Sequence, residues 1–240
     1  ATAPVDLART FGERLRQFDF MPLAAFIEEE AETYRKGHRL LYETNSAGIT
    51  VLTDTTERSP TFSLSIFENA HAQAAPTSLC YLSLPNTPDA LGAWQTLLHR
   101  PPRTLEWEGY CGLTDLDHFL GYDISAQAKS NRSRHLPDCQ HLPFLIETSN
   151  HAIDWQLQSL RHQWPLGDAD LLTQHLLLKL LLNTHSTLLM GRMNRFEGNL
   201  MTYVKPSNNK LIDRTIRYVQ TLHLRNTGNP VDYETVAFAV

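Results

Sequence analysis

Residues 176–222 read LLLKLLLNTHSTLLMGRMNRFEGNLMTYVKPSNNKLIDRTIRYVQTL, and this stretch decides which fold the sequence predicts. Apolar residues recur at helical spacing from Leu177 to Met190, which favours a helix over a strand. Side chains such as Lys179 and Arg192 interrupt the run, so it lacks the roughly 18 uninterrupted apolar residues of a membrane span. We therefore expect a long helix that is buried in the core.

A second helix is predicted after this one. Pro206 disfavours helix at the residue before it, and Ser207 is a suitable N-cap for a helix that begins near Asn208. A capping box would place Glu or Gln at the position of Lys210, where a cation opposes the helix dipole unless an anion lies beside it. A phosphate or carboxylate there would be held by Ser207, Asn208, Asn209 and Lys210. An exposed, solvent-screened lysine is the alternative.

Four short runs, in this order and spacing, carry a resemblance to a known family. They are LNTHST at 182–187, GR at 191–192, GNLM at 198–201 and SNNKLIDR at 207–214. Together they resemble the C-terminal part of the bacterial N-acetylmuramic acid 6-phosphate etherases and of glucokinase regulatory protein, which are built on the sugar isomerase (SIS) domain. The resemblance implies a phosphosugar-binding αβα sandwich, with Lys210 near the ligand at a domain or subunit junction.

The predicted fold class is α/β, namely a three-layer αβα sandwich with a mostly parallel, SIS-like sheet, a helical N-terminal extension and C-terminal helices. Residues 1–37 form the helical N-terminal segment, with helices at 6–18 and 22–37. The SIS-like α/β domain covers 38–222, and 223–240 is a C-terminal tail that we expect to be incomplete.

The composition of the chain limits its class and its partners. In 240 residues, 42% are hydrophobic and 20% charged, which suits one large globular domain, alone or with an appendage. A net charge of −5 argues against a nucleic-acid partner. The three cysteines are irregularly spaced, which fits a reducing, cytoplasmic location. The chain begins with Ala and has no signal segment, so we expect a fragment or a processed chain.

Strand-like runs at 40–42 and 49–52 flank a turn at 45–48. In an SIS domain, hydroxyls and backbone N–H groups after a strand hold phosphate, and here Thr44 and Ser46 are available for that role. The family's Gly-Thr-Ser-Gly-Arg type of loop is not present. A plain hairpin turn is therefore the favoured interpretation.

A βαβ unit is predicted downstream. Residues 78–84 are almost continuously apolar, which suits a central strand that is covered on both faces. A helix at 89–99 and a strand at 104–107 follow. This spacing supports the α/β class independently of the family resemblance.

The signal is weaker after residue 112. A short helix at 113–120, an exposed polar loop at 125–138 and a hairpin within 142–158 that turns at 149–150 are predicted. The residues His135, Cys139 and His141 lie close in sequence, but zinc sites usually need four ligands at tighter, paired spacing, so we expect no metal.

Catalytic motifs are scarce in the sequence. An acid/base carboxylate would come from Glu57, from Glu197 or from a partner domain. Glu57 opens a segment that resembles an etherase segment in which Glu precedes Pro-Thr-Phe. His185 interrupts an apolar helix, which favours a hydrogen-bonded core histidine over a general base. The Gly/Ser-rich, basic-ended segment of the etherases is replaced by GDADL at 167–171, which counts against lyase activity of this chain alone.

These observations favour a phosphosugar-binding SIS-type domain, either regulatory or the second half of a tandem SIS protein. The alternative is a sugar-phosphate lyase or isomerase, etherase-like, that is active only with a partner domain or subunit. A structural or interaction module without ligand binding is a third possibility. The expected partners are a sugar phosphate and another SIS domain or a second copy of the chain. We expect no cofactor, nucleic acid or membrane.

Overall fold

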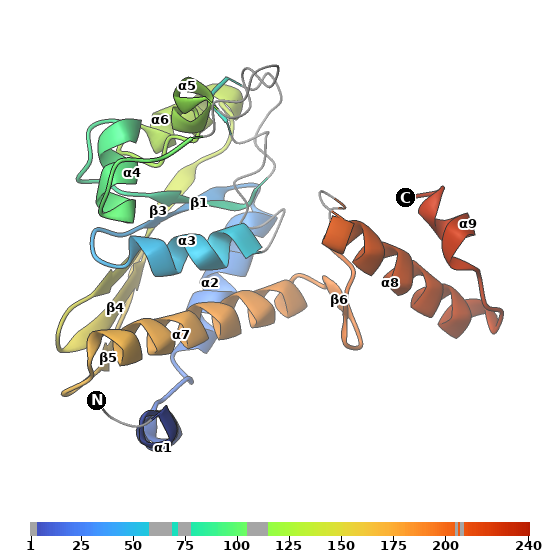
Figure 1. Cartoon of the computed structure of the whole chain (residues 1–240), viewed down its shortest axis with the longest axis horizontal. Coiled ribbons are helices and arrows are strands. Elements are labelled where there is room, and N and C mark those ends of the chain that lie inside the picture. The colour runs from blue at the N-terminus through green and yellow to red at the C-terminus, as the bar shows by residue number, and fades with distance from the viewer. Residues whose placement is uncertain (1–3, 58–68, 72–77, 105–114, 205, 207–208) are drawn as a thin grey trace. The chain divides into compact units, whose positions relative to one another are not determined.

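The computed structural model describes residues 4–57, 69–71, 78–104, 115–204, 206 and 209–240. Its contacts divide the chain into two compact units, Ala1–Leu189 and Met190–Val240, and each unit is described by itself. The first unit is an α/β domain, as predicted (Figure 1). The limits expected at residues 37 and 222 stay predictions.

One mixed sheet of five strands, in the order β2-β1-β3-β4-β5, forms the centre of the first unit. Strands β2, β1 and β3 are parallel, whereas β3, β4 and β5 are antiparallel. The antiparallel β3–β4 pair confirms the predicted hairpin at 142–158. The strands are β1 (Arg39–Glu43), β2 (Cys80–Ser83), β3 (His141–Thr148), β4 (Ala152–Leu157) and β5 (Leu160–Pro165).

The predicted hairpin after β1 is wrong, because the second run forms helix α3 (Gly48–Glu57). Val51 and Asp54 are both buried, at the i, i+3 spacing of one helix face. A Cβ atom at Gly48 would lie 2.7 Å from a methyl group of Leu97, so glycine permits α3 to pack closely against the helix that carries Leu97. The apolar run at 49–52 is too short for periodicity to distinguish a strand from a helix.

Helices α2 (Leu23–Arg35), α3 and α7 (Leu171–Arg192) lie on one face of the sheet (Figure 1). The Phe26 ring of α2 stacks on Phe144 of β3 with ring centroids 5.8 Å apart. Thr50 of α3 is hydrogen-bonded to His175 of α7 over 2.6 Å. The inner side of α7 is fully buried, which confirms the predicted core helix.

On the opposite face, α6 (Ala128–His135) lies against β2 and β3, since the Arg132 guanidinium lies over the Tyr81 ring and the Ser133 hydroxyl lies beside His141. Helix α4 (Ala90–Leu98) packs against α3. Over β4 and β5 the same face carries the exposed side chains Arg161 and Gln163. Among the described residues, helices therefore cover this face only in part. The three-layer sandwich stays a prediction.

Two further expectations for this half of the chain need correction. Strand β2 is fully buried but ends the strand order of the described sheet, so it is not central there. The segment 125–138 is not an exposed loop but contains α6. Its Arg132 is buried and donates to the Ser78 carbonyl over 2.9 Å. A contact between residues this far apart in the sequence cannot be recognised from the spacing of apolar residues.

The other predicted helices are confirmed. α1 (Pro4–Gln17) and α2 form the helical N-terminus. α4 begins after Asp89, whose carboxylate accepts from the Gly92 N–H over 2.8 Å. The short helix α5 (Leu116–Leu120) lies within the range predicted for it. Most of the strand expected at 104–107 lies outside the described residues.

The second unit contains a hairpin and two helices after the end of α7. The strands β6 (Phe196–Glu197) and β7 (Leu200–Met201) turn at Gly198, whose φ is +60°. Helix α8 (Asn209–Thr227) confirms the predicted second helix and continues past residue 222, and α9 (Tyr233–Ala237) follows. In the part of the chain that the structure describes, no helix has the length and apolar character needed to span a bilayer.

Candidate functional site

The loop between β1 and α3 lies at the carboxyl end of the parallel strands. From β1 the chain passes through α3 to β2 on one side, and later returns to β3 on the other side of β1. The strand order therefore reverses between β1 and β3. In open α/β sheets, ligands bind in the crevice outside the carboxyl ends of the strands at such a reversal.

Four hydrogen-bond donors of this loop converge on one carboxylate, that of Glu147 on β3. The backbone N–H and the side-chain amide of Asn45 donate to Oε1 over 2.8 and 3.0 Å. The backbone N–H and the hydroxyl of Ser46 donate to Oε2 over 3.1 and 2.5 Å. Both carboxylate oxygens are thus bound by a backbone and a side-chain donor, and we call Asn45, Ser46 and Glu147 the carboxylate cradle.

Thr44 holds the cradle in shape rather than lining it. Its buried Oγ1 accepts the Ala47 N–H over 3.0 Å, just before α3 begins. The Ser46 hydroxyl oxygen also accepts the Thr148 N–H over 2.8 Å, which ties the loop to the end of β3. Thr44 and Ser46, predicted to be near each other in a ligand site, are therefore together here with different roles.

The cradle has the chemistry of an oxyanion site. Consecutive backbone N–H groups, a hydroxyl and an amide at the start of a helix favour a negatively charged acceptor. Hydrogen bonds to a charged acceptor are stronger than neutral ones. The sequence did not identify Glu147 as a functional residue, because it lies 101 positions from Ser46 and only the β1–β3 pairing brings it there.

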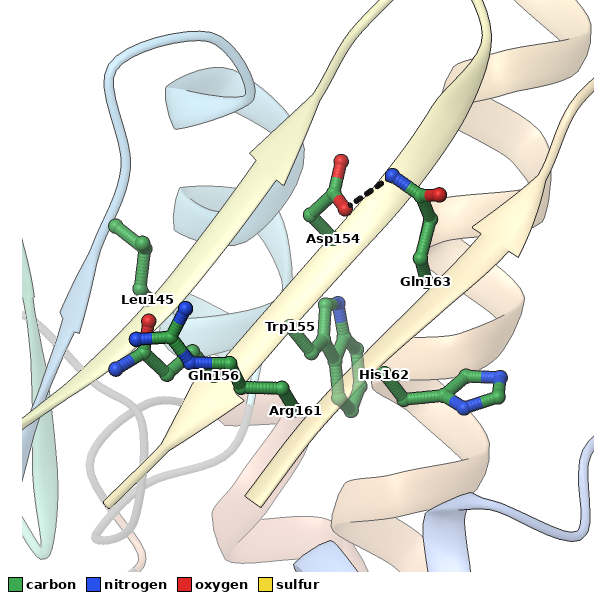
Figure 2. A pocket seen from close by; sticks show the side chains of 7 residues that line it. All are labelled: Leu145, Asp154, Trp155, Gln156, Arg161, His162 and Gln163. Carbon is green, nitrogen blue, oxygen red and sulfur yellow. Dashed lines mark hydrogen bonds between the residues drawn. The ribbon is translucent and has the colours of Figure 1, made fainter. Parts of the chain in front are cut away.

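Two shallow hollows lie on the sheet face that carries Leu145. One, of about 350 Å³, is lined by Leu145, Asp154, Trp155, Gln156, Arg161, His162 and Gln163 (Figure 2). Within it, the Gln163 amide donates to Asp154 over 2.7 Å. The second hollow, of about 310 Å³, is lined by Glu43, Leu142, Pro143, Leu145, Gln156 and Gln158. Glu43 immediately precedes Thr44, so the second hollow begins beside the cradle loop.

Glu43 is a half-buried carboxyl group in that hollow. Burial raises its pKa, and the Lys129 ammonium of α6 acts in the opposite direction. A carboxyl with this environment can accept or exchange a proton more readily than an exposed one. Glu43 was not selected from the sequence, because it reads as an ordinary polar residue after the strand-like run at 40–42.

His185 lies in the core, away from solvent. It is 1% exposed on α7, and its Nε2 is 2.8 Å from Oε2 of Glu30, which is 0% exposed on α2. Glu30 also accepts the hydroxyls of Tyr34 over 2.5 Å and of Tyr42 over 2.9 Å. Burial, and then the Glu30 carboxylate, raise the pKa of both tyrosines well above its usual value. This arrangement is a buried polar network in which Nε2 of His185 is bonded, as expected for a hydrogen-bonded core histidine, whereas Nδ1 has no hydrogen-bond partner among the described residues.

The burial of Glu30 is not evident from the sequence, because a run of three glutamates such as 28–30 is typical of a solvated helix face. The structure buries Glu30 and leaves Glu28 exposed. Tyr34, one turn later on the same side of α2, is the local signal for a buried partner.

The other candidate residues are distributed over both units. Asn209 and Lys210 are exposed in the first turn of α8, and Glu197 is exposed on β6, all in the second unit. Glu57 is the last residue of α3, and its side chain lies outside the described part. Ser207 and Asn208 also lie outside it.

The described residues contain no group of three or more His, Cys, Asp or Glu side chains that could hold a metal ion. The histidine and cysteine residues noted in the sequence lie in different environments. His141 is buried beside Ser133, whereas Cys139 is half-buried in the turn before β3.

Comparison with known proteins adds no assignment, since no family model and no curated protein matches this chain.

Proposed function

We propose that this chain is a phosphosugar-binding domain of the SIS type, regulatory or the second half of a tandem protein. The observation that carries the proposal is the carboxylate cradle, in which four donors from Asn45 and Ser46 bind the Glu147 carboxylate at the carboxyl end of β1. The phosphate of the ligand takes the place of this carboxylate when the Glu147 side chain turns away. Binding is then an exchange of one oxyanion for another.

The exchange is chemically reasonable because the same N–H and O–H donors can bind the oxygens of either a carboxylate or a phosphate. A phosphate presents three oxygens to donors that now bind two, and it carries more charge than a carboxylate. The hydrogen bond from Ala47 to Thr44 keeps the loop in shape while the acceptor changes. The resemblance of residues 182–214 to the SIS proteins supports the same ligand class and, separately, implies a ligand role for Lys210.

The sugar would lie in the hollow of about 310 Å³ that begins at Glu43. This volume is at the lower end of the range of small-molecule sites. The Gln156 amide and the Glu43 carboxyl can hydrogen-bond sugar hydroxyls there, and Leu145 offers an apolar surface to a ring face. A monosaccharide phosphate therefore fits better than a larger ligand.

The enzyme alternative, a sugar-phosphate lyase or isomerase completed by a partner domain, has less support. His185 is buried and bonded to Glu30, so it does not contribute a general base at the surface. We therefore retain binding as the function of this chain.

The test is calorimetric titration with fructose 6-phosphate, glucosamine 6-phosphate and N-acetylmuramic acid 6-phosphate, with the unphosphorylated sugars as controls. One of the phosphates should bind, and at 100 times its dissociation constant it should raise the free energy of unfolding by about 2.7 kcal/mol. Ser46→Ala should weaken binding about tenfold, as expected when a donor to a charged acceptor is lost. Equal affinity of Ser46→Ala and wild type, or no binding of any phosphate with a partner SIS domain supplied, would refute the proposal.

A further inference from the structure

The amino ends of β1 and β3 place two basic side chains next to each other. Arg39 and His141 begin these strands and are register partners in the parallel pair. Register partners point to the same side of a sheet. The His141 Nδ1 is 3.4 Å from the Ser133 hydroxyl of α6, so this is the face on which α6 packs.

Both side chains carry a buried nitrogen that lacks a hydrogen-bond partner within the described structure. For His141, which is 2% exposed, this atom is Nε2, and for Arg39 it is Nε. In the part of the chain that the structure describes, the Arg39 guanidinium otherwise donates to the nearby carbonyls of His38 over 3.0 Å and Gly37 over 3.4 Å. The described residues contain several buried polar atoms without a partner, and these two nitrogens differ from the others in belonging to register partners of paired strands.

The surroundings of these nitrogens are positively charged. Arg132 of α6 is buried with its guanidinium 5.0 Å from the centre of the Tyr81 ring, and Lys129 lies one turn earlier. Burial and then Arg132, Arg39 and Lys129 lower the pKa of His141 to about 4, while the Cys139 backbone opposes this. Within the described residues, neither Arg39 nor Lys129 forms an ion pair with a carboxylate.

We propose that a tetrahedral oxyanion, a phosphate or sulfate group, binds at the amino end of β1 and β3 between Arg39 and His141. The oxyanion accepts from Arg39 Nε and from His141 Nε2, which satisfies both buried donors. Its charge also offsets the mutual repulsion of Arg39, Arg132 and Lys129. This site lies at the opposite end of the strands from the carboxylate cradle and does not depend on the function proposed for that cradle.

Proton uptake accompanies binding at this site. The cations around His141 hold it neutral, and an oxyanion beside Nε2 favours the imidazolium. Sulfate does not titrate near neutral pH, so its affinity should increase as the pH falls from 7 towards the value of about 4 at which free His141 itself protonates. The groups that face His141 in this balance are Arg39 of β1, Arg132 and Lys129 of α6, and the Cys139 turn.

Sulfate titration of the full chain at constant ionic strength tests the proposal. Arg39→Met should weaken sulfate binding at least about tenfold, which is the expected loss of one charge-assisted hydrogen bond. Arg161→Met removes the same charge from an exposed position on β5 and should leave the affinity unchanged. Equal affinities for Arg39→Met and Arg161→Met would overturn the proposal.

A measurement on the wild-type chain keeps the proposal testable if Arg39→Met does not fold. The ¹⁵N signals of the His141 imidazole should shift on sulfate addition, and unchanged signals would overturn the proposal. Inorganic phosphate and fructose 6-phosphate then identify the source of the oxyanion. Both ligands are compared in Ser46→Ala, which weakens the carboxylate cradle, with and without Arg39→Met. Loss of both ligands on adding Arg39→Met indicates a site for phosphate esters, and loss of inorganic phosphate alone indicates a site for the free ion.

Discussion

The two ends of the β1–β3 pair differ in whether their hydrogen-bond donors have an acceptor within the described structure. At the carboxyl end, the donors of Asn45 and Ser46 are satisfied by a carboxylate of the same chain, that of Glu147. At the amino end, Arg39 and His141 are neighbours with buried donors that lack an acceptor in the described structure. If both proposed sites bind anions, the carboxyl end exchanges an internal carboxylate for the ligand, whereas the amino end gains an anion without releasing one.

The largest effect is expected from the core between the two ends, which must stay intact for either site to be measured. Glu30→Gln should lower the free energy of unfolding by about 3–5 kcal/mol, because it disturbs a buried charged group to which Tyr34, Tyr42 and His185 are hydrogen-bonded. Urea unfolding measures this change. Glu28→Gln, an exposed position on the same helix, should change it by less than about 0.5 kcal/mol.

If Glu30→Gln and Glu28→Gln are equally stable, the polar network does not support the sheet. Any loss of ligand binding in Ser46→Ala or Arg39→Met would then not be attributable to damage to this network.

The next largest effect is the pH dependence of stability that His141 causes at the amino end of β3. Because the pKa of His141 is lowered to about 4 in the folded chain, the unfolded chain binds a proton that the folded chain does not between about pH 6.5 and 4. Stability is therefore lost as the pH falls through this window, by up to about 3 kcal/mol. His141→Asn should remove this contribution, as measured by unfolding at pH 7, 5.5 and 4.5.

His151→Gln, an exposed histidine in the β3–β4 turn, is the matched control and should keep the wild-type pH dependence. Sulfate should reduce the loss in the wild-type chain if the amino-end site exists. The same loss in His141→Asn as in wild type would show that other groups cause it.

At the carboxyl end, a smaller loss of stability is expected together with a gain in ligand affinity. Glu147→Gln should lower the free energy of unfolding by about 1–2 kcal/mol, since it replaces a charged acceptor of four hydrogen bonds by a neutral one. It should also tighten phosphosugar binding, because the competing carboxylate is gone. Unfolding and calorimetry on the same preparation measure both changes. Weaker binding in Glu147→Gln would show that Glu147 contacts the ligand instead of competing with it.

The smallest effect on stability is expected for Lys210→Ala. This exposed side chain in the first turn of α8 should change the free energy of unfolding by no more than about 0.5 kcal/mol. If Lys210 has the ligand role that the resemblance implies, phosphosugar affinity should nevertheless fall. Unchanged affinity would leave Lys210 as a solvent-screened lysine, and Arg214→Ala, also exposed on α8, serves as the charge-matched control.

The candidate sites were only partly predictable. Thr44 and Ser46 were selected because hydroxyls after a strand can hold phosphate, and the structure places both in the cradle loop. Glu147 was missed, since it reads as one polar position in a hairpin strand. The pairing of Arg39 with His141 also leaves no local trace, because 102 positions separate the two residues.

The sequence by itself determined the elements whose signal is local. The periodicity of α7 and α8, the N-cap of α4 and the β3–β4 hairpin are each specified within one segment, because side-chain spacing follows the geometry of that segment. Only the tertiary structure decided that 48–57 is a helix, that α6 exists and that Glu30 is buried. These outcomes depend on contacts between distant segments, which the strand order creates and local spacing does not encode.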